Sequence, residues 1–310
     1  MLVTVTPNTG IDLTYFIAEW QANQAIRATD TIQSMAGKPT DAAFILGKLG
    51  LPSIALGFAA GTIGKRVESM LQGRGVETRF VQVDGESRIN TVIIDTHNQT
   101  QTTITATSLL VNQAHINALH EQYSKALPTA TCVIMGGSLP KGVPPTLYTE
   151  LIAEARSRHI PVIFDAEKET LLAGLQAAPT YIKPNEHEVA QLTGNIVESL
   201  DDAYRTGQAI QAKYQTRPII TLGKRGALAL LDDKAYYLPS LPVDVVSAAG
   251  AGDGMLAGLA RSIVLKQTIE SGLKTGIALA SAVCLQQGTA EFEVADFEEL
   301  MPQVQLLPYP

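Results

Sequence analysis

The sequence lacks both clusters of basic residues and long apolar runs. Its 310 residues include 23 lysines and arginines against 30 aspartates and glutamates, for a formal net charge of −7. A nucleic-acid partner requires grouped Lys and Arg, so this balance argues against one. No segment approaches the roughly 20 apolar residues of a membrane helix. The opening MLVTVTPNTGID has neither the basic start nor the apolar stretch of a secretion signal. We therefore expect a cytoplasmic protein with no nucleic acid and no membrane as partner.

Cysteine is also scarce. Cys132 and Cys284 lie far apart in apolar segments, which favours buried, reduced thiols over a disulfide or a catalytic role. Hydrophobic residues make up 45% of the chain and charged residues 17%, so there is ample material for a packed core. The length predicts one large domain, or a domain with an appendage.

Short β-branched runs alternate with longer segments of helical period. Such alternation of apolar strands with helices predicts an α/β fold, in which helices cover both faces of a mostly parallel sheet. The strand candidates are 2–6, 53–58, 132–139, 162–166, 180–184 and 218–223, and the helix candidates include 40–50, 64–75, 144–159 and 185–194.

One part of the sequence breaks this alternation. Residues 78–106 are β-rich, contain no helix candidate and alternate polar with apolar side chains, and 12–17 and 25–35 have the same character. We predict that about 12–35 and 78–106 form a small β-sheet lid on a single domain, 1–310. Such a sheet covers a site, a partner or both, because its unpaired edges need protection.

The segment SAAGAGDGMLAGLA, at 247–260, places a carboxylate inside a glycine-rich turn. We predict a strand over 238–246 and a helix whose apolar face runs from Met255 to Ile263. The backbone N–H groups of a first helical turn lack intrahelical partners and attract anions. Asp253 could merely stabilise the helix end. Glycines on both sides of it favour instead a reactive base beside a cradle for a phosphoryl group.

This GAGD segment resembles a signature of the ribokinase-like carbohydrate kinases, also called the phosphofructokinase-B family. In that family the turn binds the transferred phosphoryl group and the aspartate deprotonates the acceptor hydroxyl. The resemblance implies a three-layer α/β/α fold with a small β lid. It also implies that Asp253 is the catalytic base and that the anion hole consists of Ala249, Gly250, Ala251 and Gly252.

The sequence KPNEHE, at 183–188, resembles the family's Asn-x-x-Glu element, which implies that Asn185 and Glu188 lie near Mg²⁺ and the nucleotide phosphates. Local sequence equally predicts a capping box formed by these two residues. Lys183 is implied as a nucleotide neighbour, or is a surface charge at a strand end. Two further stretches, TLGKRGAL and QQGTAEF, resemble nucleotide-binding segments and imply roles for Thr221, Gly223, Lys224, Gly226 and Gln286.

Two stretches resemble the acceptor side of the family. TPNTGIDLTYF, at 6–16, resembles the opening pattern of the sugar-phosphate kinases and implies that Asp12 binds sugar hydroxyls, although a strand-end Asp could instead satisfy a turn. GGSLPKGVP, at 136–144, resembles a stretch at the carboxyl end of a central strand, where open α/β sheets bind ligands. Ser138 is therefore a candidate substrate neighbour.

The first signature of the family corresponds to MAGKPTDAAFILGKLG, with Gly37 and Lys38 retained as implied substrate-binding residues. Ala36 and Pro39 replace two glycines, and Asp41, a third candidate substrate-binding residue, replaces an asparagine. An amide donates and accepts hydrogen bonds, whereas a carboxylate only accepts them and adds charge. The sugar specificity of the family therefore does not carry over to this chain.

ESRIN, at 86–90, resembles a motif of fructose-phosphate and tagatose-phosphate kinases and places Arg88 on the lid. Arg27 and Lys38 are expected to join it, because two guanidinium groups and one ammonium suit a phosphate dianion. Each of these cations is alternatively a solvated surface charge.

Taken in order along the chain, these motifs imply an ATP-dependent kinase that also uses Mg²⁺. The pattern is most similar to the 1-phosphofructokinase, tagatose-6-phosphate kinase and minor 6-phosphofructokinase group. The implied acceptor is a phosphorylated ketohexose (fructose 1-phosphate, fructose 6-phosphate or tagatose 6-phosphate), and the lid is implied to form a homodimer contact. Two alternatives stay open: a kinase of an unphosphorylated sugar or nucleoside, and a non-catalytic sugar or nucleotide sensor of the same fold.

Overall fold

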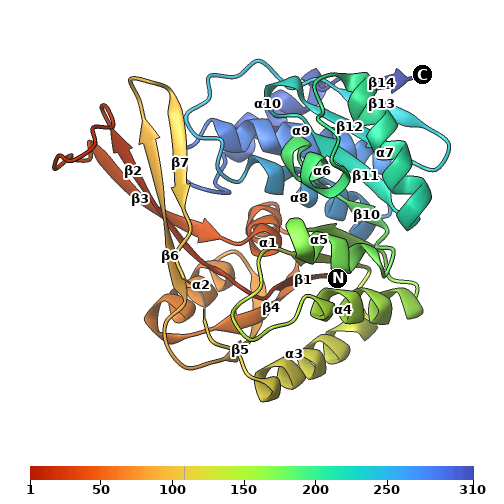
Figure 1. Ribbon diagram of the computed structural model, residues 1–310, viewed down its shortest axis with the longest axis horizontal. Coiled ribbons are helices and arrows are strands. Elements are labelled where there is room, and N and C mark those ends of the chain that lie inside the picture. The colour runs from red at the N-terminus through yellow and green to blue at the C-terminus, as the bar shows by residue number, and fades with distance from the viewer. Residues whose placement is uncertain (108) are drawn as a thin grey trace.

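The computed structural model describes residues 1–107 and 109–310. Within them, the main body is a ten-stranded sheet between two layers of helices (Figure 1). In spatial order its strands are β14 (Leu307–Tyr309), β13 (Ala235–Leu238), β12 (Ala227–Leu230), β11 (Arg217–Thr221), β10 (Tyr181–Ile182), β9 (Val162–Asp165), β8 (Cys132–Gly136), β1 (Leu2–Thr6), β4 (Ser53–Ala59) and β5 (Val76–Gln82). From β11 to β5 all pairings are parallel, while β12, β13 and β14 add an antiparallel edge.

Helices bury both faces of this sheet. Alternate residues of β1 show the division, because Val3 and Val5 belong to one core and Leu2 to the other. The first core is covered by α3 (Gln113–Ala126), α4 (Thr146–Ser157), α5 (Lys168–Leu175), α6 (Glu186–Thr193) and α7 (Leu200–Tyr214). The second is covered by α1 (Lys38–Lys48), α2 (Gly61–Gln72), α8 (Ala251–Val264), α9 (Ile269–Cys284) and α10 (Val294–Leu300). Burial on both sides explains why the parallel strands are almost wholly apolar.

Short 3₁₀ turns complete the regular structure at Leu127–Thr129, Gly223–Arg225 and Met301–Gln303. Cys132 and Cys284 are both free thiols, as the sequence predicts, but only Cys132 is buried and Cys284 is half-buried. Among the described residues, no helix combines the length and apolar character needed to cross a membrane.

A second, smaller sheet projects from the body at the left of Figure 1 and confirms the predicted lid. Its strand order is β3 (Asp30–Ala36), β2 (Gly10–Ile17), β6 (Arg88–Asp95) and β7 (Thr100–Ile104). Phe16, Val92 and Ile94 form its own small buried cluster. The predicted extent of the lid is wrong at one point, because 78–82 lie in β5 and pair with β4 at the edge of the main sheet. The polar–apolar alternation of β5 is that of an edge strand, which the sequence does not distinguish from a lid strand.

The strand expected over 238–246 is also wrong. Strand β13 ends at Leu238, and the following residues up to the glycine turn form no strand. Pro239 and Pro242 supply the physical reason, since neither has an N–H to donate to a sheet. The glycine turn is therefore delivered by an irregular segment.

The parallel strands end at one common edge, as parallel strands do. Ser138, Asp165 and Lys183 lie at the carboxyl ends of β8, β9 and β10. Helix α8 packs on the sheet and contacts β8 and α1, so its first turn joins these side chains. The main sheet thus positions residues that are far apart in the chain.

Candidate active site

The glycine turn at the start of α8 has a backbone that only glycine adopts without strain. Gly250 is the residue before the first helical turn and has φ of +83°. A Cβ on Gly250 would lie 2.4 Å from the backbone nitrogen of Ala290. A Cβ on Gly252 would lie 3.4 Å from Nζ of Lys183, so a lysine ammonium stands beside the turn. Bare backbone, a helix amino terminus and a cation together make this turn suited to an anion.

Asp253 lies in this first turn and is 7% exposed. Burial raises the pKa of its carboxyl to about 7, against the opposing effect of the Lys183 ammonium. A carboxyl that ionises near neutral pH is matched to removing a proton from a hydroxyl. The geometry therefore suits the base that the sequence predicts at Asp253.

A buried network of charges lies next to the turn. Nζ of Lys38 lies 2.9 Å from Oδ1 of Asp165 and 3.1 Å from Oε1 of Glu188. Nζ of Lys183 lies 2.9 Å from Oδ2 of Asp165. Burial by itself would raise the pKa of Asp165, but the ammonium groups of Lys183 and Lys38 outweigh it and hold that pKa below its ordinary value. Asp165 is consequently a buried carboxylate with two cationic partners.

Asn185 and Glu188 form the capping box that local sequence predicts. Oδ1 of Asn185 accepts from the Glu188 N–H at 2.8 Å, and Oε2 of Glu188 accepts from the Asn185 N–H at 2.8 Å. Thr221 lies beside Asn185 in an isolated parallel bridge. The surface-charge interpretation of Lys183 is wrong, because Lys183 is 4% exposed.

Three of the other residues predicted to bind nucleotide lie in the turn that follows β11. Gly223 and Lys224 are exposed in the 3₁₀ turn between β11 and β12, which confirms the predicted strand–turn–strand. Gly226 closes that turn, with φ of +96°. Nε2 of Gln286 donates to Oδ2 of Asp296 at 3.3 Å. Nucleotide contacts of these residues stay predictions.

The acceptor side is built where the lid meets the body. Asp12 on β2 accepts from Nδ2 of Asn90 at 2.8 Å and from the Thr289 hydroxyl at 3.1 Å. Nη1 of Arg88, on β6, donates to Oγ of Ser138 at 3.3 Å. The structure thus brings Arg88 and Ser138 together, as expected for two substrate neighbours.

Asp41 lies on the first turn of α1, behind Gly37, and is 3% exposed. Its Oδ2 accepts from the Gly37 N–H at 3.0 Å. Its Oδ1 is buried and has no hydrogen-bond partner among the described residues. Burial first, and the charges of Asp253 and Asp12 next, raise the pKa of Asp41 well above its ordinary value. Asp41 therefore belongs to an acidic group that also contains the candidate base.

The predicted cluster of three phosphate-binding cations is not formed within one chain. Lys38 is held by Asp165 and Glu188 on the nucleotide side. Arg27 is exposed in the connection between β2 and β3, and among the described ion pairs it has none. Figure 1 shows that this connection lies at the outer end of the lid. The prediction failed because Lys38 begins a helix whose first turn points at the strand ends, whereas Arg27 follows a loop away from them.

Three residues of this region were not singled out from the sequence: Asp165, Asn90 and Thr289. Asp165 was detectable, because it ends an apolar strand just as Ser138 follows one, and such positions line ligand sites. Asn90 and Thr289 lie in the motifs ESRIN and QQGTAEF, but only the structure shows their hydrogen bonds to Asp12.

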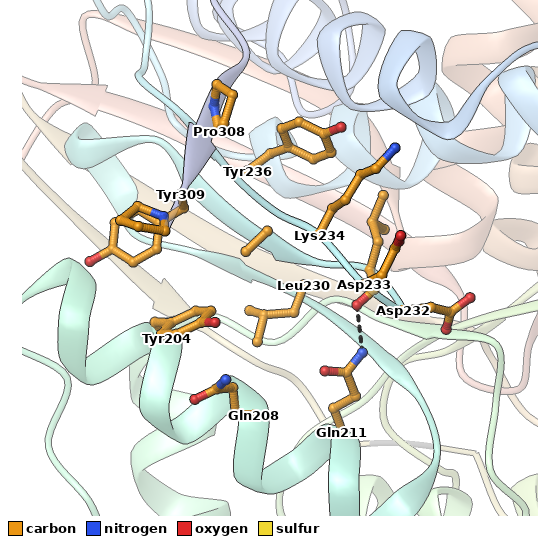
Figure 2. A pocket seen from close by; sticks show the side chains of 13 residues that line it. Tyr204, Gln208, Gln211, Leu230, Asp232, Asp233, Lys234, Tyr236, Pro308 and Tyr309 are labelled. Atoms are coloured by element: carbon orange, nitrogen blue, oxygen red, sulfur yellow. Dashed lines mark hydrogen bonds between the residues drawn. The ribbon is translucent and has the colours of Figure 1, made fainter.

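A separate cavity of about 550 Å³ lies away from these residues, at the antiparallel edge of the main sheet (Figure 2). Helix α7, the turn between β12 and β13, and β14 enclose it. Its labelled side chains include Tyr204, Tyr236 and Tyr309. None of the site residues predicted from the sequence lines it, so it is not the candidate active site.

An anion-binding glycine turn, an adjacent buried carboxyl and a network of lysines at the strand ends define a phosphotransferase class of site. Comparison with known proteins agrees with that class. A model of the pfkB family of carbohydrate kinases matches residues 6–295. The chain belongs to this family and is an ATP-dependent carbohydrate kinase.

Individual relatives match over the full length. A 1-phosphofructokinase of Bacillus subtilis is 26% identical over 308 residues, which cover 99% of each chain. A tagatose-6-phosphate kinase of Staphylococcus epidermidis is 27% identical over 313 residues, again covering 99% of each. The crystal structure of a possible 1-phosphofructokinase from Thermotoga maritima is 26% identical, covers all of both chains and superposes with a TM-score of 0.88. The ribokinase-like fold predicted from the motifs is thereby confirmed.

Proposed function

We propose that this kinase transfers the γ-phosphoryl group of ATP to a hydroxyl of a phosphorylated ketohexose, with Asp253 as the base. The observation that carries the proposal is the position of Asp253, buried in the first turn of α8 beside the Lys183 ammonium and in the electrostatic range of Asp12. Asp253 accepts the proton of the acceptor hydroxyl as the oxygen of that hydroxyl attacks the γ-phosphorus, and the bond from the γ-phosphorus to ADP breaks. The glycine turn and Lys183 stabilise the negative charge on the transferring group.

Arg88 supports a substrate that already carries a phosphate. Its Nη1 reaches Ser138, while its buried Nε has no hydrogen-bond partner among the described residues. A half-buried guanidinium with an unused donor is suited to a phosphate oxygen. The names of the B. subtilis and S. epidermidis relatives agree with a ketohexose phosphate.

The alternative acceptor is an unphosphorylated sugar or nucleoside. It is favoured by the absence of an Arg27–Lys38–Arg88 cluster within the described chain, which leaves Arg88 facing Asp12 and Asp41. Arg88 is nevertheless positioned on the substrate side of the lid, so we place a sugar phosphate first. A sensor without turnover is opposed by the intact base and glycine turn.

The donor set fits Mg²⁺ held through water and the nucleotide phosphates rather than by direct ligation. Both oxygens of Glu188 and the side-chain oxygen of Asn185 already accept hydrogen bonds. Among the described residues, no group of three His, Cys, Asp or Glu could enclose a metal. Mg²⁺ commonly keeps several waters and one or two carboxylates. When bound, it would neutralise phosphate charge, with Asn185 and Glu188 holding its outer shell.

We also propose a homodimer through the lid. Strands β3 and β7 leave two edges of the small sheet unpaired in one chain, and every residue of β7 is exposed. Edges of this kind are normally covered. Light scattering should give about twice the chain mass of 33.1 kDa, and a monomer at all concentrations would contradict the proposal.

The acceptor is identified by a coupled ADP-release screen. It compares fructose 1-phosphate, fructose 6-phosphate, tagatose 6-phosphate, ribose and adenosine with the purified enzyme and Asp253→Asn. We expect one ketohexose phosphate to stimulate ADP release, and the variant to lose about 10²- to 10⁴-fold in kcat while still binding ATP. Stimulation by ribose or adenosine alone would select the alternative acceptor. Equal turnover by the variant would remove Asp253 as the base.

A further inference from the structure

Three carboxyl groups gather at the acceptor side of the site, from three different elements. Asp12 belongs to β2, Asp41 to α1 and Asp253 to α8, and each is less than a tenth exposed. The charged groups that act on Asp41 are Asp253, Asp12 and, with opposite sign, Arg88. At Asp41, one guanidinium therefore opposes the charges of two neighbouring acids. Lys38, the cation closest to Asp41 in sequence, is held by Asp165 and Glu188 instead.

The three carboxyls differ in how their charge is compensated. Asp12 accepts a hydrogen bond on each oxygen, from Asn90 and from Thr289. The ammonium groups of Lys183 and Lys38 partly compensate the charge of Asp253. Asp41 has one backbone N–H and no ion pair among the described residues. An ionised, buried carboxylate with so few partners is costly, so Asp41 is the carboxyl that retains its proton.

The hydrogen bonding of Asp41 is that of a carboxylic acid. Oδ2 accepts from the Gly37 N–H, as a carbonyl oxygen does. Oδ1 is buried without a partner among the described residues, which is the position left for the hydroxyl. A protonated carboxyl has one O–H donor in addition to its acceptor oxygen. Oδ1 can thus donate to an oxygen brought by a ligand, which an ionised Asp41 cannot do.

We propose that Asp41 is a specificity-determining residue that binds the acceptor as a neutral acid, donating a hydrogen bond from its Oδ1 hydroxyl to a hydroxyl oxygen of the sugar. This proposal rests on the proposed kinase function and adds that Asp41 is the donor, and the sugar the acceptor, of one hydrogen bond. It selects acceptors that present an oxygen lone pair to Oδ1, and it disfavours those that present an ammonium group there. It also leaves Asp253 free to ionise without a second negative charge from Asp41.

Protonation of Asp41 fixes the direction in which the KM for the acceptor changes with pH. Burial and the neighbouring carboxylates favour the protonated form of Asp41, so the donor is present at low pH and is lost as pH rises through the pKa of Asp41. The KM for the acceptor should be flat at low pH and increase at high pH. Ionisation of Asp253 causes a separate increase of kcat/KM, which occurs at lower pH than the loss of the Asp41 proton.

The test compares the full-length wild type with Asp41→Asn, Asp41→Ala and the surface control Asp232→Asn, using the acceptor found in the ADP-release screen. An amide supplies a donor at every pH. Asp41→Asn should therefore keep the low-pH KM within about threefold and abolish its increase at high pH, while Asp41→Ala should raise the low-pH KM by about 3- to 10-fold. The control, whose carboxylate pairs with Arg217 far from the site, should match the wild type.

Two results would overturn the proposal. If Asp41 is ionised during turnover, Asp41→Asn will shift the acid limb of kcat/KM to lower pH, by about one unit or more, because a negative neighbour of Asp253 disappears. If Oδ1 makes no contact with the acceptor, Asp41→Ala will leave its KM unchanged.

A measurement without turnover separates this proposal from the proposed function. The infrared difference between wild type and Asp41→Asn at neutral pH should contain the carbonyl band of a protonated carboxyl, and the difference for Asp232→Asn should not. Absence of the band overturns the neutral state of Asp41 even if the enzyme phosphorylates a sugar phosphate. Presence of the band with no sugar acceptor in the screen would reject the proposed function and the acceptor contact while retaining the neutral acid.

Discussion

Nζ of Lys38 lies 2.9 Å from Oδ1 of Asp165, and this ion pair joins the first turn of α1 to the carboxyl end of β9. The Asp165 side chain has no exposed surface, so its charge is compensated by protein groups alone. Lys38 follows the glycine that contacts Asp41, and Asp165 lies beside Lys183. The pair therefore connects the acceptor side of the site to the phosphate side.

Replacing Lys183 by Met should destabilise the protein. Lys183 is buried and pairs with fully buried Asp165, and removing one partner of such a pair typically lowers the free energy of unfolding by about 3–5 kcal/mol. Denaturant unfolding measures this loss. The exposed Lys234→Met should change it by less than about 0.5 kcal/mol, and an equal effect of both substitutions would refute the burial argument.

The acid limb of the pH profile should report Asp253. Its carboxyl must be ionised to take a proton, and its pKa is raised to about 7, so kcat/KM should increase with pH up to about 7, before the loss of the Asp41 donor lowers it at higher pH. Lys183 lowers this pKa, so any folded fraction of Lys183→Met should show the limb at higher pH. Initial rates across pH measure both midpoints. A midpoint near the ordinary value for Asp would exclude Asp253 as the titrating group.

Arg88→Ala should weaken binding of a sugar phosphate but not of ATP. Loss of a charge-assisted contact to phosphate corresponds to an increase in the acceptor KM of about 10- to 100-fold. Steady-state kinetics with each substrate varied separately distinguish the two effects. Arg79→Ala, which removes a surface partner of Glu77 on β5, is the matched control. An unchanged acceptor KM in Arg88→Ala would count against a phosphorylated acceptor.

Gly250→Ala should abolish most activity and lower the melting temperature. The methyl group would meet the backbone of Ala290 at 2.4 Å, and φ is +83°. Gly75→Ala is the control, because Gly75 has φ of +74° but open space around its Cα, so it has only the backbone strain of about 1 kcal/mol. Comparison by thermal unfolding isolates the clash. Equal destabilisation by Gly250→Ala and Gly75→Ala would show that the glycine turn shifts to accommodate the methyl group without cost.

The sequence predicts the α/β architecture because apolar strands that alternate with helices are typical of a parallel sheet buried on both faces. It also predicts Asp253, because glycines around a carboxylate have a local chemical logic. The edge position of β5 is not predictable in this way, since edge strands of a body and strands of a lid both alternate polar and apolar residues. Pro239 and Pro242 could have excluded the strand over 238–246.

Charge pairing was the harder part of the site to predict. A lysine in a signature motif gives no indication of its partner, and Lys38 pairs with Asp165 and Glu188 across more than 120 residues of sequence. Asn185 and Glu188 show the reverse case, because a capping box is local and is visible in four consecutive residues. Their contact with nucleotide or Mg²⁺ stays a prediction.

The hydrogen bond from Thr289 to Asp12 spans 277 positions of the chain. During synthesis, which proceeds from the amino terminus at about 5–20 residues per second, Asp12 emerges long before its partner exists. The catalytic turn at Gly250 likewise packs against Ala290. A ribosome must therefore complete nearly the whole chain before the acceptor side is closed, so premature termination yields inactive fragments rather than a weakly active enzyme.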